Sequence, residues 1–244
     1  MEDNQPIILL KDTQIPENLG FTARSMLNCG LENLRVVNPR FTLENEKIIP
    51  LSAGATEVIN HTKHFSSLEK SVEDINFLVA CTARKRSLTK TILNLSDAID
   101  EVIKKINEKN KVGILFGAEQ SGLTNNDLSL CNRVLTIDTN PDFKSLNLSH
   151  SVVIVCYEWL RKNKTKRKKI NQIPKKLATK KDLNNFYISL SSLLRRSGFL
   201  KTKERSENIL LKINNIFSRV DLDKNEIDIL FGIMKSLFDS KNVK

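Results

Sequence analysis

The chain has 244 residues, 40% of them hydrophobic, and a mean hydropathy of −0.29. Its apolar runs are far shorter than the ~18 residues of a membrane-spanning helix, so the composition excludes an integral membrane protein and we expect no membrane partner. The net charge is +11, and the whole excess lies in residues 161–181, because the basic residues outside that block equal the 28 acidic ones in number.

Short apolar runs alternate with helical patterns over the first two thirds of the chain. The expected strands are Ile7–Leu10, Leu34–Val37, Phe77–Cys81, Val112–Phe116 and Val134–Ile137. The expected helices are residues 16–30, with Pro16 in the first turn and Gly30 just past the end, and Asp97–Lys109, Asn125–Leu130 and Leu148–Lys162. Continuous apolar strands between helices predict an α/β fold, a parallel sheet with helices on both faces.

The last third of the chain shows helical patterns only. Capping boxes at Thr179–Asp182 and Asp223–Glu226 open two helices, and a third covers Glu204–Arg219 between them. We therefore expect an α/β domain (1–162), a basic linker (163–179) and a small all-α module (180–244). The module is marginal alone by burial scaling, so we expect it to dock on another surface. The basic block has no large apolar anchors, which favours nucleic acid over membrane as its partner.

The cysteines and the N-terminus indicate an intracellular protein without a metal site. The four cysteines are far apart and form no CxxC pair, so neither disulfides nor a zinc site is expected. The acidic N-terminus with a four-residue apolar run is unlike a secretory signal, and we expect a cytoplasmic location. No dinucleotide, P-loop or GxSxG fingerprint is present.

Three polar loops follow the expected strands that end at Leu10, Phe116 and Ile137, where parallel sheets bind ligands. The first contains Asn18 and Arg24, six residues apart and expected on roughly the same side of a helix. An arginine there can hold a phosphate through its guanidinium fork. In the second, Gly117 and Gly122 permit a close backbone approach to a ligand, and Glu119 could face that ligand. The third has more candidate helix caps than one helix needs, namely Ser145, Asn147 and Ser149.

Together these loops resemble the motifs of the SpoU/TrmH family in the SPOUT superfamily of RNA methyltransferases. The three matches are N18-LGFTA-R24, L115-FG-A-E119-xSGL and S145-L-N147-LSHSV. The stretch LTIDTNPDFKSLNLSHSVVIVCYEW and the CTAR of 81–84 are further similar to the branch that methylates the ribose at tRNA position 32. The C-terminal helices also look like the extension of that branch, so the resemblance covers nearly the whole chain.

The resemblance implies a C-terminal trefoil knot, a homodimer, and methyl transfer from S-adenosyl-L-methionine to a tRNA ribose 2′-hydroxyl in the anticodon loop. It implies Arg24 as the catalytic residue, oriented with its substrate by Asn18, Glu119, Ser145 and Asn147. The implied cofactor-binding residues are Cys81, Thr82, Ala83, Gly117, Ile137, Lys144, Ser145 and Leu146. The second motif departs from the family's common Gly-Arg-Glu, because Ala118 replaces the arginine.

Other functions fit parts of the sequence. A member of the same family could methylate ribosomal RNA, although the C-terminal extension favours tRNA. An RNA-binding protein without catalysis is suggested by Ala118 alone, and the intact Arg24 and Asn147 argue against it. A structural dimer that uses its helical module for protein contacts leaves the basic block unexplained.

Overall fold

The computed structural model describes residues 4–84, 90–166, 175–200 and 203–239. Seven strands form one sheet in which every hydrogen-bonded pair is parallel. Across the sheet they are β3 (Lys63–Phe65), β2 (Leu34–Val37), β1 (Ile7–Lys11), β6 (Val112–Phe116), β4 (Phe77–Cys81), β7 (Arg133–Thr136) and β5 (Ile92–Asn94). The predicted α/β fold is confirmed.

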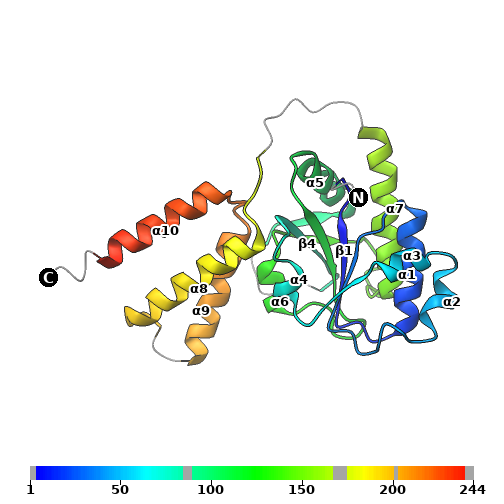
Figure 1. The fold of residues 1–244 in the computed structure, drawn as a ribbon, viewed down its shortest axis with the longest axis horizontal. Helices are drawn as coiled ribbons and strands as arrows, with labels where there is room; N and C mark the ends of the chain where they lie inside the picture. The colour runs from blue at the N-terminus through cyan, green and yellow to red at the C-terminus, as the bar shows by residue number, and fades with distance from the viewer. Residues whose placement is uncertain (1–3, 85–89, 167–174, 201–202, 240–244) are drawn as a thin grey trace.

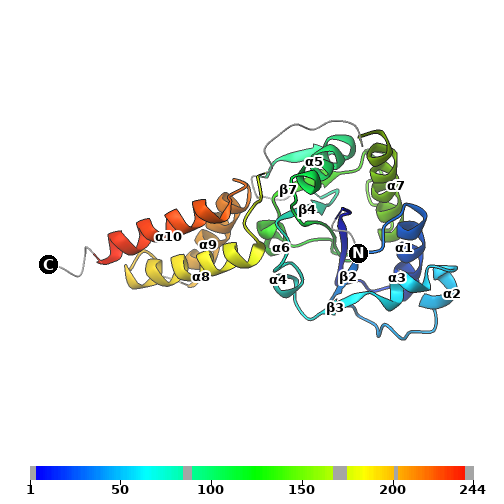
Figure 2. The ribbon, with the colours of Figure 1, turned by 45° about the horizontal axis from the view of Figure 1, so that its top comes forward.

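Helices cover both faces of this sheet (Figures 1 and 2). One face carries α1 (Pro16–Asn28), α5 (Leu95–Asn107) and α7 (Leu148–Lys166), with α2 (Ile48–Ser52) and α3 (Thr56–Asn60) packed on α1. The other face carries α4 (Leu68–Ser71) and α6 (Asn125–Leu130).

The central strand β1 shows why the apolar runs are continuous. Ile8 and Leu10 enter the core under α1 and α7, whereas Ile7 and Leu9 enter the core under α4 and α6. All four side chains are at most 5% exposed. A strand buried on both faces has no place for polar side chains, which is the pattern expected of a parallel sheet.

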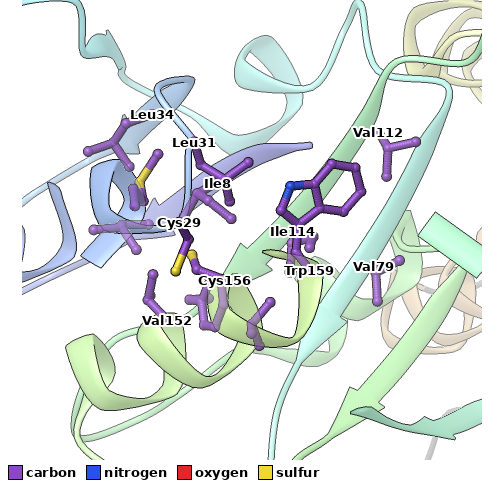
Figure 3. Packing of buried hydrophobic residues seen from close by; sticks show 14 of the residues in the cluster. Ile8, Cys29, Leu31, Leu34, Val79, Val112, Ile114, Val152, Cys156 and Trp159 are labelled. Atoms are coloured by element: carbon purple, nitrogen blue, oxygen red, sulfur yellow. The ribbon is translucent and has the colours of Figure 1, made fainter. Parts of the chain in front are cut away.

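The larger core is packed around α7 (Figure 3). Trp159 is 3% exposed and lies beside Ile114 of β6. Cys29, which ends α1, and Cys156 of α7 lie in the same cluster, and both thiols are free. Burial raises the pKa of both thiols, so they remain protonated at neutral pH and act as small apolar side chains.

The helical module consists of α8 (Lys180–Arg196), α9 (Lys203–Ser218) and α10 (Lys224–Asp239). It projects from the α/β domain (Figures 1 and 2) and has its own aromatic core. Phe186 meets Phe217 and Phe231 edge-on, with ring centroids 4.7 and 5.6 Å apart. Helix α9 packs on α6 of the α/β domain.

The segment that leads into α8 is held by two buried asparagines of the α/β domain. Asn110 Nδ2 donates to the Lys175 carbonyl, and Asn110 Oδ1 accepts from the Leu177 amide at 2.7 Å. Asn76 Nδ2 donates to the Leu177 carbonyl at 2.7 Å. Amide side chains can pair with both backbone groups of an irregular segment, so these two residues fix where the module begins.

Several elements differ from the sequence-based expectations. The edge strands β3 and β5 were not predicted, because each has only three residues and exposed side chains. Helix α7 continues four residues further than expected, to Lys166. Residues 167–174 of the predicted basic linker lie outside the described part of the chain. The trefoil knot stays a prediction, and none of the described helices is long and apolar enough to cross a bilayer.

Candidate active site

The loops that follow β1, β4, β6 and β7 lie at the same edge of the sheet, because these parallel strands are neighbours. The three polar loops predicted from the sequence are among them. A cleft opens between the loops after β4, β6 and β7, with Cys81, Gly117, Ile137 and Leu146 in its wall. This is the location at which α/β sheets bind ligands.

Glu119, just after β6, is an acceptor for the loop that follows β1. Its carboxylate accepts hydrogen bonds from Asn18 Nδ2 at 2.7 Å, the Gln14 amide at 2.9 Å and Thr13 Oγ1 at 3.1 Å. The Ile15 amide is 3.4 Å away. Glu119 thus accepts from backbone amides at the start of α1, where helices lack intrahelical partners.

Asn18 extends this contact to the third loop. Its Oδ1 accepts from Asn147 Nδ2 at 3.1 Å, while its own Nδ2 donates to Glu119. Asn147 Oδ1 in turn accepts from the Ser149 amide at 2.8 Å and from Ser149 Oγ at 2.7 Å. One chain of hydrogen bonds, Glu119–Asn18–Asn147, therefore joins the three predicted motifs.

Asn147 is the residue that caps α7. It directly precedes Leu148, and its side-chain oxygen accepts from the first free amides of the helix. Ser149 supports this cap by donating its hydroxyl to the same oxygen. Ser145 takes no part in the cap and lies exposed in the cleft wall.

The cleft wall contains all eight residues that the sequence implied for the cofactor: Cys81, Thr82, Ala83, Gly117, Ile137, Lys144, Ser145 and Leu146. It also contains five that sequence reasoning missed: Arg84, Phe116, Thr139, Leu148 and Ser151. Arg84 was within the quoted CTAR stretch, which was the available signal. Desolvation raises the pKa of the Cys81 thiol to about 12, so this thiol stays neutral and does not compete as a nucleophile.

Gly117 is required by the loop itself. A Cβ atom at this position would lie 2.5 Å from the Gly122 carbonyl carbon and 2.6 Å from the Leu123 amide nitrogen. The loop is folded back on itself by a bond from the Gly122 amide to the Ala118 carbonyl at 2.8 Å. The close approach that the structure shows at Gly117 is between two backbone segments of the loop, and the predicted approach to a ligand stays a prediction.

Arg84 supplies a guanidinium beside this loop, in which position 118 is an alanine. Ala118 is 6% exposed, so its methyl group is enclosed. Arg84, from the loop after β4, donates its guanidinium to the Gln120 carbonyl, and its side chain lies 3.9 Å from the position of a Cβ on Gly122. A guanidinium therefore borders the loop even though position 118 carries none.

Arg24 lies apart from the hydrogen-bonded residues. It is exposed, and among the described residues it makes no hydrogen bond or ion pair; Asn18 is 3% exposed and points to Glu119. The expectation that these two share one side of α1 is wrong. Six residues turn a helix by about 600°, which is 120° short of two full turns. Arg24 is thus free to meet a ligand outside the cleft.

The chain belongs to the SpoU methylase family of RNA methyltransferases, because residues 5–157 match the model described as "SpoU rRNA Methylase family". Residues 181–244 match a second model, described as "tRNA methyltransferase TrmJ, C-terminal domain". The family predicted from the three motifs is confirmed.

Individual relatives match over nearly the full chain. A protein of Photorhabdus laumondii named tRNA (cytidine/uridine-2′-O-)-methyltransferase TrmJ is 34% identical over 94% of this chain and 95% of its own length. The crystal structure of TrmJ from Z. mobilis is 32% identical, with a TM-score of 0.85 over 96% of this chain and 99% of that one. A SpoU methyltransferase of Streptomyces viridochromogenes, solved with AdoMet, shares the fold at 18% identity, a TM-score of 0.52 and coverage of 68% of this chain and 63% of that one.

Proposed function

We propose that this protein transfers a methyl group from S-adenosylmethionine to a ribose 2′-hydroxyl of tRNA, at position 32 of the anticodon loop. The observation that carries the proposal is the chain Glu119–Asn18–Asn147, which joins all three family motifs beside one cleft. The relatives named as tRNA 2′-O-methyltransferases, similar along the whole chain, support tRNA as the substrate.

The residues of the cleft fit S-adenosylmethionine. Phe116, Ile137 and Leu146 supply apolar surface for a flat purine, and the hydroxyls of Thr82 and Ser145 can pair with polar groups of the ligand. The Glu119 carboxylate also borders the cleft, and its negative charge would suit a cationic ligand. These residues, with Cys81, Ala83, Gly117 and Lys144, would hold the cofactor, which supplies a methyl group already activated for transfer.

The protein's own task is to position the acceptor and help its proton leave. In the transfer, a carbon–sulfur bond breaks, an oxygen–carbon bond forms, and the hydroxyl proton passes to an acceptor. The pKa of a free guanidinium lies above ~12, so arginine is a poor general base at neutral pH. Arg24 instead binds the neighbouring phosphate with its fork and polarises the hydroxyl, and phosphate or water takes the proton. Asn18, Glu119 and Asn147 hold the loops that orient the two reactants, and the exposed hydroxyl of Ser145 would help to orient them from the cleft wall.

A homodimer would bring a second surface to Arg24. Helices α1 and α7 pack together, and Phe21, Val153 and Tyr157 are 41%, 37% and 60% exposed on them. Large apolar side chains exposed on neighbouring helices are typical of a contact surface, and Arg24 lies on the same helix as Phe21. We propose that the dimer contact lies here. The basic linker (163–179) and the helical module (180–244) would hold the RNA, and the protein would act in the cytoplasm, where tRNA is found.

The test is methyl transfer from labelled S-adenosylmethionine to unmodified bulk tRNA, with ribose-methyl mapping of the product. We expect incorporation at position 32 with the wild-type protein and at least a ~10²-fold loss with Arg24→Ala, a typical contribution of a residue that assists proton transfer. Methylation of ribosomal RNA but not of tRNA would replace the substrate in this proposal. Absence of cofactor binding would favour an RNA-binding protein without catalysis.

Arg24→Lys separates the two contributions of the guanidinium. Lysine keeps the positive charge but has a single ammonium in place of the planar fork, so we expect turnover well below the wild type. Near-normal turnover by Arg24→Lys would contradict the role of the fork and leave charge alone as the contribution of Arg24.

A further inference from the structure

Two buried lysines lie where the helical module meets the α/β domain. Lys90, just before β5, donates to the Cys131 carbonyl at 2.6 Å, to the Ser129 carbonyl at 3.3 Å and to Ser218 Oγ at the end of α9. Lys180, the first residue of α8, donates to Asn132 Oδ1 at 2.5 Å. Lys90 is 9% exposed and Lys180 5% exposed.

A third contact completes this module interface, which we define as Lys90, Asn132, Lys180, Ser218 and Asp221. Asp221, in the turn after α9, accepts from Arg133 Nη2 at 2.9 Å and from Asn132 Nδ2 at 3.1 Å. Polar side chains of two module segments, at Lys180 and at residues 218–221, therefore contact two segments of the α/β domain, at Lys90 and at Asn132.

Buried polar contacts of this kind set position more than stability. Desolvation lowers the pKa of Lys90 to about 7 and that of Lys180 to about 8, and each lysine also faces Arg133. Apolar side chains of similar size are often as stable at such sites, whereas directional polar contacts specify one arrangement. The polar contacts of the module interface therefore favour one orientation of the helical module on the α/β domain.

The same residues connect to the wall of the cleft. The Thr91 carbonyl, next to Lys90, accepts from the Val134 amide of β7 at 3.0 Å, and β7 leads to Ile137 in the wall. Asn132 Oδ1 also accepts from the Leu78 amide of β4 at 3.0 Å, and β4 ends in the cleft at Cys81. The strands β4 and β7, which lead into two parts of this wall, are therefore both held next to the module interface.

We propose that Lys90 is a positioning residue through which the seating of the helical module sets the shape, and hence the affinity, of the cofactor cleft. The proposal rests on the proposed function in that the cleft must bind an S-adenosyl ligand. By linkage, a module that shapes the cleft must itself be seated more firmly when the cleft is filled.

The first test is binding of S-adenosylhomocysteine, without RNA, to the full-length protein by calorimetry. Lys90→Met keeps the length of the side chain and removes its amine, and we expect the dissociation constant to rise about threefold to thirtyfold. In methyl transfer, the KM for S-adenosylmethionine should rise likewise while kcat at saturating cofactor changes little. Lys63→Met is the matched control, because Lys63 is an exposed lysine of β3, at the opposite edge of the sheet from β5; its dissociation constant should equal the wild-type value.

Ser218→Ala removes the same contact from the module side, at a residue that does not line the cleft. We expect a smaller weakening of S-adenosylhomocysteine binding, and little further loss when Ser218→Ala is added to Lys90→Met. This variant also decides the question if Lys90→Met does not fold. Two results together would overturn the proposed coupling between module and cleft. Ser218→Ala would bind S-adenosylhomocysteine with wild-type affinity, and the effects of the two substitutions would be fully additive in the double variant.

Hydrogen exchange gives a readout that a purely structural role would not change. Adding S-adenosylhomocysteine should slow exchange at the end of α9 and in the turn through Asp221 in the wild type, and much less in Lys90→Met. Equal slowing in both would refute the proposal. If the wild type binds S-adenosylhomocysteine but does not methylate tRNA, the proposed substrate fails while this coupling remains measurable.

Discussion

Glu119 illustrates how one residue can organise a site without acting on the substrate. Its carboxylate accepts from Thr13, Gln14 and Asn18, so most of its hydrogen-bonding capacity is used inside the protein. A carboxylate with several donors holds the loop after β1 against the loop after β6, which are 106 residues apart at Thr13 and Glu119. Its effect on a ligand is therefore exerted mainly through the position of Asn18 and the start of α1.

Glu119→Gln tests this organising role. Glutamine would present an NH₂ group to donors that need an acceptor, and hydrogen bonds to a charged group contribute about 1.5–3 kcal/mol each. We expect the free energy of unfolding to fall by about 2–3 kcal/mol in urea titration, with weaker S-adenosylhomocysteine binding. The exposed Glu44 provides the control, since Glu44→Gln should change neither quantity. Loss of ligand affinity without any loss of stability would instead indicate direct contact between Glu119 and the cofactor.

The site residues show where sequence reasoning succeeds and where it ends. The loops were predictable because glycine and polar residues follow buried apolar strands, and the neighbouring strands bring the loops together. The partner of Glu119 was not predictable, because its contacts with Thr13 and Asn18 join residues more than a hundred positions apart. The different directions of Asn18 and Arg24, about 120° apart around the helix, follow from helix geometry and could have been derived from their spacing.

At the scale of elements, α7 carries both the core and the site. Trp159 is buried among the strands, while the N-terminus of the helix is capped by Asn147 in the candidate active site. Loss of an asparagine cap costs about 1 kcal/mol. The cap and the link to Asn18 are made by different atoms of the Asn147 amide, so the two roles can be separated by substitution.

Asn147→Asp should separate the cap from the link. Aspartate keeps the oxygen that accepts from Ser149 but lacks the Nδ2 that donates to Asn18. We expect Asn147→Ala to lower both the stability of the protein and methyl transfer, and Asn147→Asp to regain most of the stability but not the activity. Urea titration and tRNA methylation measure the two effects. Equal activity of Asn147→Asp and the wild type would show that the link to Asn18 is dispensable.

Elements were predictable where their sequence pattern was long and uniform. The strands with five apolar residues, such as β6, and the capped helices, such as α6 and α8, were found in place. The strands β3 and β5 lie at the two edges of the sheet and have three residues each, too few for a periodic pattern. Their pairing comes from neighbouring strands and is not encoded in their own side chains.

At the scale of the whole molecule, the module interface makes stability depend on pH. The pKa of Lys90 falls from 10.5 to about 7, and it faces Lys180, Arg133, Arg219 and the Cys131 thiol. Above a lowered pKa, the folded protein binds fewer protons at this lysine than the unfolded chain does. Burial of the charged lysine therefore destabilises the fold fully below about pH 7, and this destabilisation disappears as the pH rises towards 10.5.

We therefore expect the free energy of unfolding to increase between pH 7 and pH 8.5. One pKa unit corresponds to about 1.4 kcal/mol, so the increase from Lys90 should be on the order of 1–2 kcal/mol over this range. Lys90→Met should flatten the increase but not remove it, because the pKa of Lys180 is also lowered, to about 8. Urea titrations at several pH values give the slopes, and identical slopes in the two proteins would assign the dependence to other groups.

The charge distribution predicts how the molecule holds RNA. Eleven basic residues lie within 161–181, of which Arg167, Lys168 and Lys169 are consecutive. Each phosphate contact contributes roughly 0.7–0.9 to the slope of log affinity against log salt. We expect a steep fall in tRNA affinity with salt, and a slope smaller by about 2–3 when these three residues are changed to glutamine. Filter binding at several salt concentrations measures both, and a shallow wild-type slope would exclude this role of the basic block.

The strand order has a consequence for the protein as it leaves the ribosome. β1 lies in the middle of the sheet and pairs with β2 on one side and β6 on the other, while β4 pairs only with β6 and β7. The first half of the sheet can form early, but β4 emerges before both of its partners. A nascent chain that ends before Val112 therefore exposes the bare edge of β1 and the whole apolar strand β4. Unpaired strands of this kind associate with other chains, so the interval before β6 is synthesised is when this protein most needs a chaperone.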